Sequence, residues 1–234
     1  IKGKKTMEIN SLFETTRKFW EEETVRGKLV YPDEQVIRFI KKNADKDDTI
    51  LDFGCGYGRH AISLGLENYK NIIAMDYNRP NLLHIEEVAK KNNLNIKCIQ
   101  NSGLKIPLEE NSVDIVIAHA SLFYSQQSGL ERLLSNLSLV MKTNALMWCN
   151  FRTPEDDLIK KGLEADKNFY VVKFRNSNAK VGYFSCSQNE LSDIFEKAGF
   201  DVISSDIFEF TSNNQQVHNS WFVLNVRKIG KNPR

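Results

Sequence analysis

The stretch ILDFGCGYGRH, residues 50–60, places glycines at positions 54, 56 and 58 directly after a short apolar run. Glycine lets the backbone turn tightly, and a position without a side chain lets a ligand lie against the main chain. The apolar run that ends at Phe53 has the length of a buried strand. We therefore predict a strand over residues 49–53, a ligand-binding glycine loop, and a helix over residues 58–66.

Two phosphate-binding patterns with similar glycines fit this loop poorly. A P-loop needs a lysine followed by serine or threonine after its glycines, and the chain has none at that spacing. A dinucleotide fingerprint, GxGxxG, needs a glycine where the chain has Arg59. Asp76 ends the next apolar run about 20 residues later, where a carboxylate can accept hydrogen bonds from the hydroxyls of a ribose. The pattern indicates a ligand that contains adenosine and favours one other than a dinucleotide.

The composition is that of one domain, which we expect to span residues 1–234. The 32 basic and 30 acidic residues are scattered and give a net charge of +2, which argues against a nucleic-acid partner. No apolar run approaches the ~18 residues of a membrane span, and the start IKGKKTMEIN lacks the apolar part of a signal peptide. We expect no membrane partner and a cytoplasmic location, and the abundant lysine and asparagine favour a bacterial source.

The cysteines stand far apart along the chain and show no CxxC spacing. Three lie in apolar stretches and Cys55 lies in the glycine loop, so we expect reduced thiols. We predict no zinc site and no other metal.

Apolar spacing predicts strands and helices that alternate along the chain. The expected strands are residues 49–53, 71–76, 95–100, 113–120 and 145–151, with two long β stretches over 201–210 and 218–228. The expected helices are residues 11–23, 32–43, 58–66, a segment that begins at Asn78, 128–142 and 187–200. This alternation predicts a doubly wound α/β fold with a mostly parallel sheet, whose ligands bind at the carboxyl ends of the strands.

Some details of these elements can be predicted as well. The apolar face of the helix after Asn78 is expected to hold Leu82, Leu83, Val88 and Ala89. A capping box of Ser187 with Glu190 begins the helix over 187–200. Residues 1–45 are expected to form an N-terminal helical cap, and residues 155–186 an insertion with strands over 169–175 and 180–186.

Together these stretches resemble the class I S-adenosylmethionine-dependent methyltransferases. LDFGCGYGRH is similar to their first motif and IIAMDYNRPNL to their second. IQNSGLKIPLEENSVDIVIAHASLFYS resembles the block around their third and fourth strands, and the closing β pair resembles their terminal hairpin. The resemblance implies a seven-stranded, mostly parallel sheet with an antiparallel last strand, and S-adenosylmethionine as cofactor.

The resemblance also implies where that cofactor binds. Its positions here are Asp52, Gly54, Cys55, Gly56, Arg59, Asp76, Tyr77, Ser102, Gly103, Leu104 and His119. Asp52 and the first glycines are expected at the methionine part, whose carboxylate would also meet the positive charge of Arg59. Asp76 would hold the ribose and Tyr77 would pack on the adenine. The family usually has an aspartate where this chain has Ser102, so we expect backbone contacts to the adenine there.

His119 follows the fourth strand and is predicted to approach the methyl-bearing sulfur, where it would be the general base. An alternative is a structural histidine bonded to the backbone. The expected acceptor site holds Trp20, Tyr31, Tyr124 and Arg152, although aromatic residues at helical spacing are also typical of a core.

The sequence after the fourth strand, AHASLFYS, lacks the [DN]PP[YF] motif of nucleic-acid and protein amino-methylating relatives. We therefore predict methyl transfer to a small molecule, with an oxygen of a saccharide or a phosphorylated metabolite in bacterial cell-surface or secondary metabolism as the narrower hypothesis. Two alternatives stay open. One is a non-catalytic subunit that binds S-adenosylmethionine for a partner enzyme. The other is an NAD-dependent dehydrogenase, against which Arg59 and the closing β pair both argue.

Overall fold

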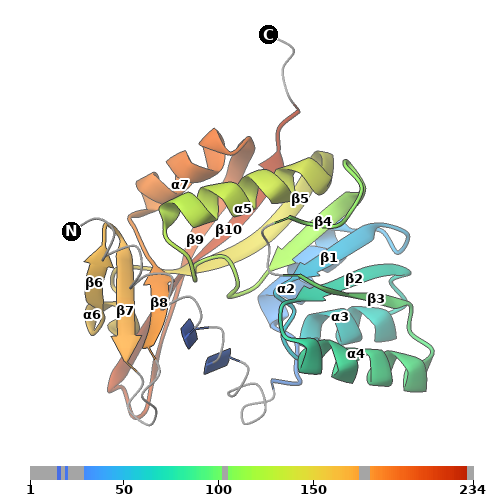
Figure 1. Cartoon of the computed structure of the whole chain (residues 1–234), viewed down its shortest axis with the longest axis horizontal. Helices are drawn as coiled ribbons and strands as arrows, with labels where there is room; N and C mark the ends of the chain where they lie inside the picture. Colours follow the sequence, from blue (N-terminus) through green and yellow to red (C-terminus); the bar gives the residue numbers. More distant parts are fainter. Residues whose placement is uncertain (1–14, 17–18, 21–28, 102–104, 174–179, 231–234) are drawn as a thin grey trace.

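The computed structural model describes residues 15–16, 19–20, 29–101, 105–173 and 180–230. Within these residues the main element is a seven-stranded sheet with the order β3-β2-β1-β4-β5-β10-β9 (Figure 1). Its strands are β1 Thr49–Phe53, β2 Asn71–Asp76, β3 Ile96–Gln100, β4 Val113–Ala118, β5 Met141–Arg152, β9 Phe200–Ser212 and β10 Val217–Lys228. Strand β10 runs antiparallel to the other six strands of this sheet, which confirms the predicted fold class.

Helices cover both faces of this sheet. They are α2 Glu34–Asn43, α3 Arg59–Leu66, α4 Arg79–Asn92, α5 Gln127–Val140 and α7 Gln188–Lys197. The apolar sides of α2, α3 and α4 join one buried cluster, and those of α5 and α7 join a second cluster on the other face (Figure 1). Strand β4 shows why both faces are covered, because Ile115 and Ile117 enter the first cluster while Val116 and Ala118 enter the second.

The order of the strands reverses between β1 and β4. The chain proceeds from β1 to β2 and β3 on one side, then returns to place β4 beside β1 on the other side. In such sheets the connections leave in opposite directions at this point, so a crevice forms beyond the carboxyl ends of the two strands. The glycine loop follows β1, and it therefore lies at the position where the fold places a ligand.

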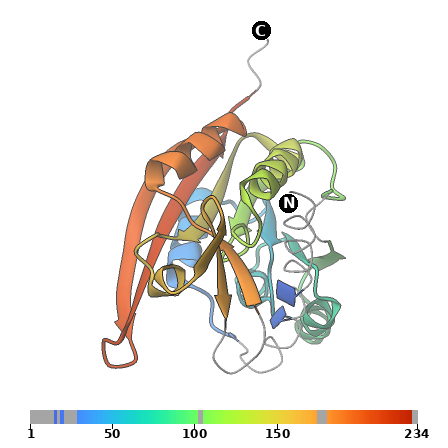
Figure 2. The same ribbon diagram turned by 60° about the vertical axis from the view of Figure 1, so that its left-hand side comes forward.

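The insertion forms a small antiparallel sheet beside the carboxyl ends of the large one. It contains α6 Asp157–Lys160, β6 Leu163–Asp166, β7 Phe169–Lys173 and β8 Lys180–Phe184 (Figure 2). The backbone N–H of Phe184 donates to the carbonyl of Phe123, 2.7 Å away, and the hydroxyl of Ser185 donates to the carbonyl of Arg152. These bonds attach the small sheet to the segments that follow β4 and β5. The strands β7 and β8 were predicted, whereas α6 and β6 were not.

The expected apolar face of α4 is partly wrong. Leu83 is 51% exposed, and the buried apolar residues are Leu82, Ile85 and Ala89. These three residues follow helical spacing, since Ile85 lies one turn after Leu82 and one turn before Ala89. Asn78 occupies the predicted N-cap position, but its side chain makes no capping hydrogen bond.

Of the predicted helix over residues 11–23, the structure describes four residues, Thr15, Thr16, Phe19 and Trp20, all in helical conformation. The rest of that prediction lies outside the described residues. The predicted helix over 32–43 begins two residues later, because Asp33 serves as the N-cap of α2 and accepts a hydrogen bond from the backbone N–H of Gln35. None of the helices in the described part of the chain combines the length and apolar character that a bilayer crossing requires.

The predicted capping box of α7 is confirmed and gives a test of the fold. The hydroxyl of Ser187 accepts the backbone N–H of Glu190, whose carboxylate accepts the backbone N–H of Ser187 in return. Ser187→Ala removes one side of this exchange and should lower the free energy of unfolding by about 1 kcal/mol, as measured by urea denaturation. Ser135→Ala on the exposed side of α5 is the control and should change it by less than about 0.5 kcal/mol. Equal effects of the two changes would contradict the capping role.

Candidate functional site

The loop after β1 is held against the end of β2. The backbone N–H groups of Gly54 and Cys55 both donate to the carbonyl of Met75, at 2.8 and 3.0 Å. Gly54, Gly56 and Gly58 have φ angles of 70°, 53° and 82°, a backbone conformation that side chains disfavour. The sequence prediction of a glycine-dependent loop at the sheet edge is therefore confirmed.

The glycines of this loop have different surroundings. A Cβ atom at Gly58 would lie 2.4 Å from the Ile85 side chain, and a Cβ atom at Gly54 would lie 2.4 Å from Cβ of Ser121. At Gly56, a Cβ atom would have nothing within 4 Å. Gly58 thus allows α3 to pack closely on α4, whereas Gly56 borders open space in which a ligand can lie against the backbone.

Asp76 connects this loop to the start of α4. One carboxylate oxygen accepts the N–H of Gly56 at 2.9 Å, and the other accepts the N–H of Asn78 at 2.8 Å. Burial raises the pKa of Asp76, and these backbone N–H groups act in the opposite direction. The backbone N–H of Tyr77 is a third donor to this carboxylate. A carboxylate has about four acceptor sites, so the geometry is compatible with the predicted hydrogen bonding from a ribose hydroxyl.

Asp52 lies beneath the loop, on the side of α3. Its side chain is 1% exposed, and one carboxylate oxygen accepts the backbone N–H of Ala61 at 3.2 Å. Burial raises the pKa of Asp52 to about 7, while the Ala61 N–H and the charge of Arg59 lower it. The carboxyl group therefore anchors the first turn of α3, immediately behind the part of the loop where the methionine moiety is predicted.

Arg59 and His119 lie together on the side of the sheet that α2 and α3 cover. A guanidinium nitrogen of Arg59, Nη2, lies 3.2 Å from each ring nitrogen of His119. The His119 ring stacks in parallel on the indole of Trp148, with 5.4 Å between the ring centres. Another guanidinium nitrogen, Nη1 of Arg59, donates to the carbonyl of Tyr31 at 3.3 Å.

The turn after β4 contains an unusual backbone conformation. Ala120 has a φ angle of 52°, and its N–H donates to the side-chain oxygen of Asn150 at 2.6 Å. The next residue, Ser121, has a buried hydroxyl with no hydrogen-bond partner among the described atoms, and its Cβ faces Gly54. Strained backbone and unsatisfied polar atoms in native proteins concentrate at functional sites.

Sequence reasoning did not identify Asn150 or Ser121 as parts of the site. The signal for Asn150 was a polar residue within the apolar run ALMWCNF, which is buried on both faces of the sheet. No comparable signal existed for Ser121, because its position beside Gly54 depends on the pairing of β1 with β4.

A group of aromatic side chains lies between the turn after β4 and the small sheet. Tyr124 contacts Trp20 and Tyr183, with ring centres 5.6 and 5.5 Å apart. Burial raises the pKa of Tyr124 well above its ordinary value, and the neighbouring hydroxyls of Tyr183 and Tyr77 add to the increase, while Arg152 opposes it. Tyr77 follows Asp76, so the aromatic group adjoins the expected adenosine end of the site.

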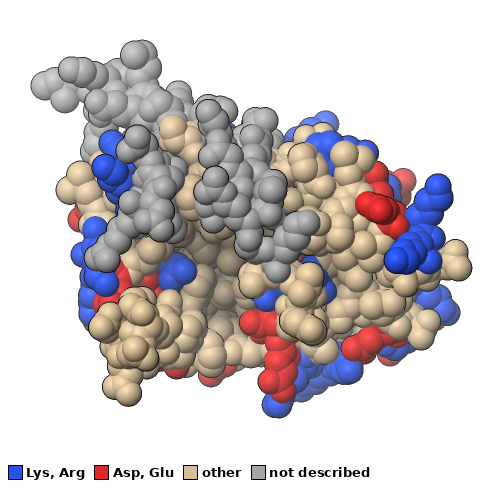
Figure 3. All heavy atoms as spheres, turned by 90° about the horizontal axis from the view of Figure 1, so that it is seen from below, with Lys and Arg blue, Asp and Glu red and all other residues tan. Residues whose placement is uncertain are grey.

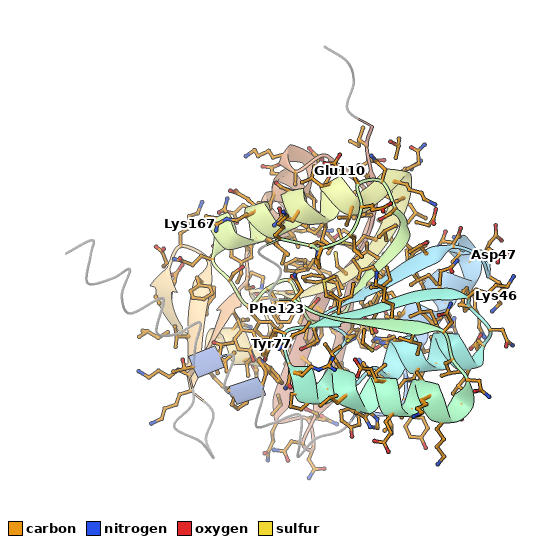
Figure 4. All side chains as sticks on the ribbon, turned by 45° about the vertical axis from the view of Figure 1, so that its right-hand side comes forward. Lys46, Asp47, Tyr77, Glu110, Phe123 and Lys167 are labelled. Carbon is orange, nitrogen blue, oxygen red and sulfur yellow. The ribbon has the colours of Figure 1, made fainter. Side chains whose placement is uncertain are left out.

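The figures show how this region is arranged. In Figure 4, Tyr77 and Phe123 both lie at the edge of the large sheet that faces the small one. Figure 3, which views the molecule from below, shows the described surface hollowed between the small sheet and the α3–α4 layer.

Arg152, at the end of β5, contacts this aromatic group. Its guanidinium lies 4.1 Å from the ring centre of Trp221 and 6.0 Å from that of Tyr183. Nη1 donates to Asp156 at 2.7 Å, and the two side chains are 18% and 1% exposed. The Nε atom of Arg152 is buried and has no hydrogen-bond partner among the described atoms. The charge is thus largely balanced, and the Nε–H has no acceptor among the described atoms.

The other predicted site residues are distributed as follows. Tyr31 is 83% exposed, and its backbone carbonyl, not its ring, takes part in the contact with Arg59. Cys55 is buried, and burial raises the pKa of its thiol well above the ordinary value, so it packs in the loop as an unreactive thiol. Residues 102–104, which include the predicted adenine contacts, lie outside the described residues.

Known proteins share both sequence and fold with this chain. Residues 50–144 match the family described as methyltransferase domain. Over 112 residues, 48% of this chain and 41% of the relative, the chain is 30% identical to an uncharacterized methyltransferase-like protein of Schizosaccharomyces pombe. A solved S-adenosylmethionine-dependent methyltransferase of Methanosarcina mazei has a TM-score of 0.71 at 17% identity, covering 82% of this chain and 97% of that one. Residues 50–144 thus match a methyltransferase domain, and the described chain has the fold of the class I methyltransferases.

A second solved structure extends the likeness of this methyltransferase domain over nearly the whole chain. It is the Burkholderia thailandensis 1,6-didemethyltoxoflavin-N1-methyltransferase, with 1,6-didemethyltoxoflavin and S-adenosylhomocysteine bound. Its TM-score is 0.62 at 14% identity, and the match covers 96% of this chain and 87% of that one. The chain spans less than half the length of the curated relatives that it matches.

The solved neighbour of Methanosarcina mazei is S-adenosylmethionine-dependent, and that of Burkholderia thailandensis has S-adenosylhomocysteine bound. The residues of this chain are compatible with such a ligand, because the backbone at Gly56 borders open space and the Asp76 carboxylate lies beside it. Within the described ranges, no three His, Cys, Asp or Glu side chains are grouped so that they could bind a metal ion.

The raised pKa of Asp52 predicts that the stability of the protein depends on pH. Between about pH 4 and pH 7 the native state binds a proton at Asp52 that the unfolded chain has lost, so stability falls as the pH rises through this window. Asp52→Asn carries no charge. Its free energy of unfolding relative to wild type should rise by up to about 4 kcal/mol from pH 4 to pH 8, measured by urea denaturation. A difference that stays constant with pH would show that Asp52 titrates normally.

The turn after β4 gives a second prediction. Asn150→Ala removes the acceptor for the Ala120 N–H and should lower the free energy of unfolding by about 1–3 kcal/mol. Ala120→Gly relieves the left-handed backbone and should raise it by about 1 kcal/mol. Urea denaturation of both variants checks this, and a destabilised Ala120→Gly would mean that the turn is not strained.

Proposed function

We propose that this methyltransferase transfers a methyl group from S-adenosylmethionine to a small-molecule acceptor held against the aromatic group after β4. The observation that carries the proposal is the open space beside Gly56, next to the carboxylate of Asp76, within a domain whose family uses this cofactor.

When bound, the cofactor supplies a methyl group on a sulfonium, which passes to the acceptor atom as the bond to sulfur breaks and a neutral thioether leaves. Since this methyl group is already activated, the chain contributes mainly by binding and aligning the two reactants. Gly56 and Asp76 would hold the adenosine and its ribose, and Tyr77 would pack on the adenine. Ser121 offers a buried hydroxyl beside Gly54 for the methionine moiety.

Three features support an acceptor with an apolar or ring-shaped body and an anionic or hydrogen-bond acceptor group. The rings of Trp20, Tyr124 and Tyr183 supply contact area, and the raised pKa values keep both tyrosine hydroxyls protonated as donors. The unpaired Nε–H of Arg152 supplies a directional donor. An oxygen of a saccharide or a phosphorylated metabolite fits this description and remains the narrower hypothesis, with bacterial cell-surface or secondary metabolism as its context.

Two further parts of the proposal concern the cellular location and the general base. We propose a cytoplasmic location because the described cysteines are all free thiols. We assign no general base, since the ring nitrogens of His119, the predicted base, already face Arg59 and Asp33.

The cofactor site is tested by filling the space beside Gly56. Gly56→Asn adds a side chain there, and asparagine tolerates the left-handed backbone better than other residues do. The Kd for S-adenosylhomocysteine, measured by isothermal titration calorimetry, should rise at least about tenfold.

Gly199→Asn is the matched control for this change. Gly199 follows α7, has a φ angle of 87°, and a Cβ atom there would meet only the Ser138 hydroxyl at 3.9 Å. Its Kd should stay within about twofold of wild type. Equal affinities of the two variants, or tight binding of NAD without binding of S-adenosylhomocysteine, would refute the proposed cofactor site. A screen for transfer of a radiolabelled methyl group to candidate acceptors then separates an enzyme from a non-catalytic binding subunit.

A further inference from the structure

A polar cluster lies behind the glycine loop, on the face of the sheet that α2 and α3 cover. It consists of Asp33, Arg59, His60 and His119, and the indole of Trp148 closes it on the sheet side. These residues come from the N-cap of α2, the first turn of α3, the end of β4 and the middle of β5. The proposed function gives none of these four residues a role in binding or catalysis.

His119 lies at the centre of this cluster. Its ring nitrogens are each 3.2 Å from Nη2 of Arg59, and its Nε2 is 3.6 Å from the carboxylate of Asp33. The parallel stack on Trp148 fixes the plane of the ring. The side chain is 19% exposed, so most of its surface is covered by these contacts.

The remaining members determine the charges that face His119. The backbone N–H of Asp33 donates to Nε2 of His60 at 3.3 Å, which requires a neutral His60 ring. Burial lowers the pKa of His60 to about 2, in agreement with that neutral state. The hydrogen bond to His119 is the main cause that lowers the pKa of Asp33, to about 2. His119 therefore lies between one fixed negative charge, on Asp33, and one fixed positive charge, on Arg59.

Arg59 is the link between this cluster and the cofactor site. It is the first residue of α3 and directly follows Gly58, the last glycine of the loop. Contacts with the Tyr31 carbonyl and with His119 hold it in one place. Arginine loses much rotamer freedom when it binds an anion, and a guanidinium that is already fixed binds more tightly.

We propose that His119 is a positioning residue that, together with Asp33, holds the Arg59 guanidinium in place for the carboxylate of the cofactor's methionine moiety. This inference rests on the proposed function and assigns His119 a role in cofactor affinity in place of proton abstraction. It also connects the chain before α2 to cofactor binding, because Tyr31 and Asp33 supply two of the contacts in the cluster.

The test compares two ligands that differ in the amino-acid part, which includes the carboxylate. S-adenosylhomocysteine has the amino-acid part, whereas 5′-methylthioadenosine has only the adenosine and a thioether. His119→Phe keeps a ring to stack on Trp148 and removes both ring nitrogens. By isothermal titration calorimetry, this change should weaken S-adenosylhomocysteine binding about tenfold and leave 5′-methylthioadenosine binding within about twofold.

Two further variants make the comparison specific. His119→Gln restores a polar group beside Arg59 and should recover part of the lost affinity. In the Arg59→Met background, where the guanidinium is absent, His119→Phe should cause no additional loss for S-adenosylhomocysteine.

Each outcome leads to a distinct conclusion. Equal weakening of both ligands by His119→Phe would show a merely structural role, and no weakening would show that Arg59 needs no support. Unchanged affinity with a lower turnover at saturating S-adenosylmethionine would return His119 to the role of general base. Failure of the wild-type chain to bind S-adenosylhomocysteine would refute the proposed function itself, separately from this inference.

Discussion

The hydrogen bonds of the Asp76 carboxylate are the constraint on which the site depends. One oxygen holds the glycine loop at Gly56, and the other holds the backbone at Asn78, where α4 begins. Because Gly54 and Cys55 are bonded to the adjacent Met75, the loop after β1 is fixed to the end of β2 at several points. The shape of the open space beside Gly56 is therefore determined by the pairing of these two strands, before any ligand arrives.

Much of this arrangement could be predicted from the sequence, because its determinants are local. The strands over residues 49–53 and 71–76 have the predicted bounds, since each is a short apolar run between polar residues. The wrong prediction for the apolar face of α4 has a local cause too, because the adjacent leucines at 82 and 83 cannot both face the sheet. Short polar elements such as α6 and β6 gave no periodic signal at all.

The contacts around His119 could not be predicted in the same way. These contacts join residues from separate elements. They depend on how α2 and α3 pack on the sheet, and no sequence motif indicates them. The face of the sheet toward which His119 points determines which residues it contacts. Side chains alternate along β4, so His119 continues the row of Ile115 and Ile117 toward α2 and α3, away from the aromatic group.

The arginines at the two ends of the proposed site, Arg152 and Arg59, have different charged neighbours. At the acceptor end, Arg152 and Asp156 form a partly buried pair, so the aromatic surroundings meet little net charge. At the proposed methionine end, Arg59 contacts the His119 ring and lies in the field of the Asp33 carboxylate. This difference is consistent with a conserved chemical group at one end, the amino-acid part of the cofactor, and a variable acceptor at the other.

The unequal surroundings of Gly56 and Gly58 have a consequence for how such a domain can diverge. Replacement of Gly58 would push α3 away from α4, so any descendant that still folds is expected to keep it. Replacement of Gly56 meets no neighbour, so apart from the strain of its left-handed backbone it would remove the space for a ligand. A homologue that has lost its cofactor but kept its fold should therefore retain the glycine at the position of Gly58 and tolerate a larger residue at that of Gly56. Position 56 would then distinguish active lineages from those that have become purely structural.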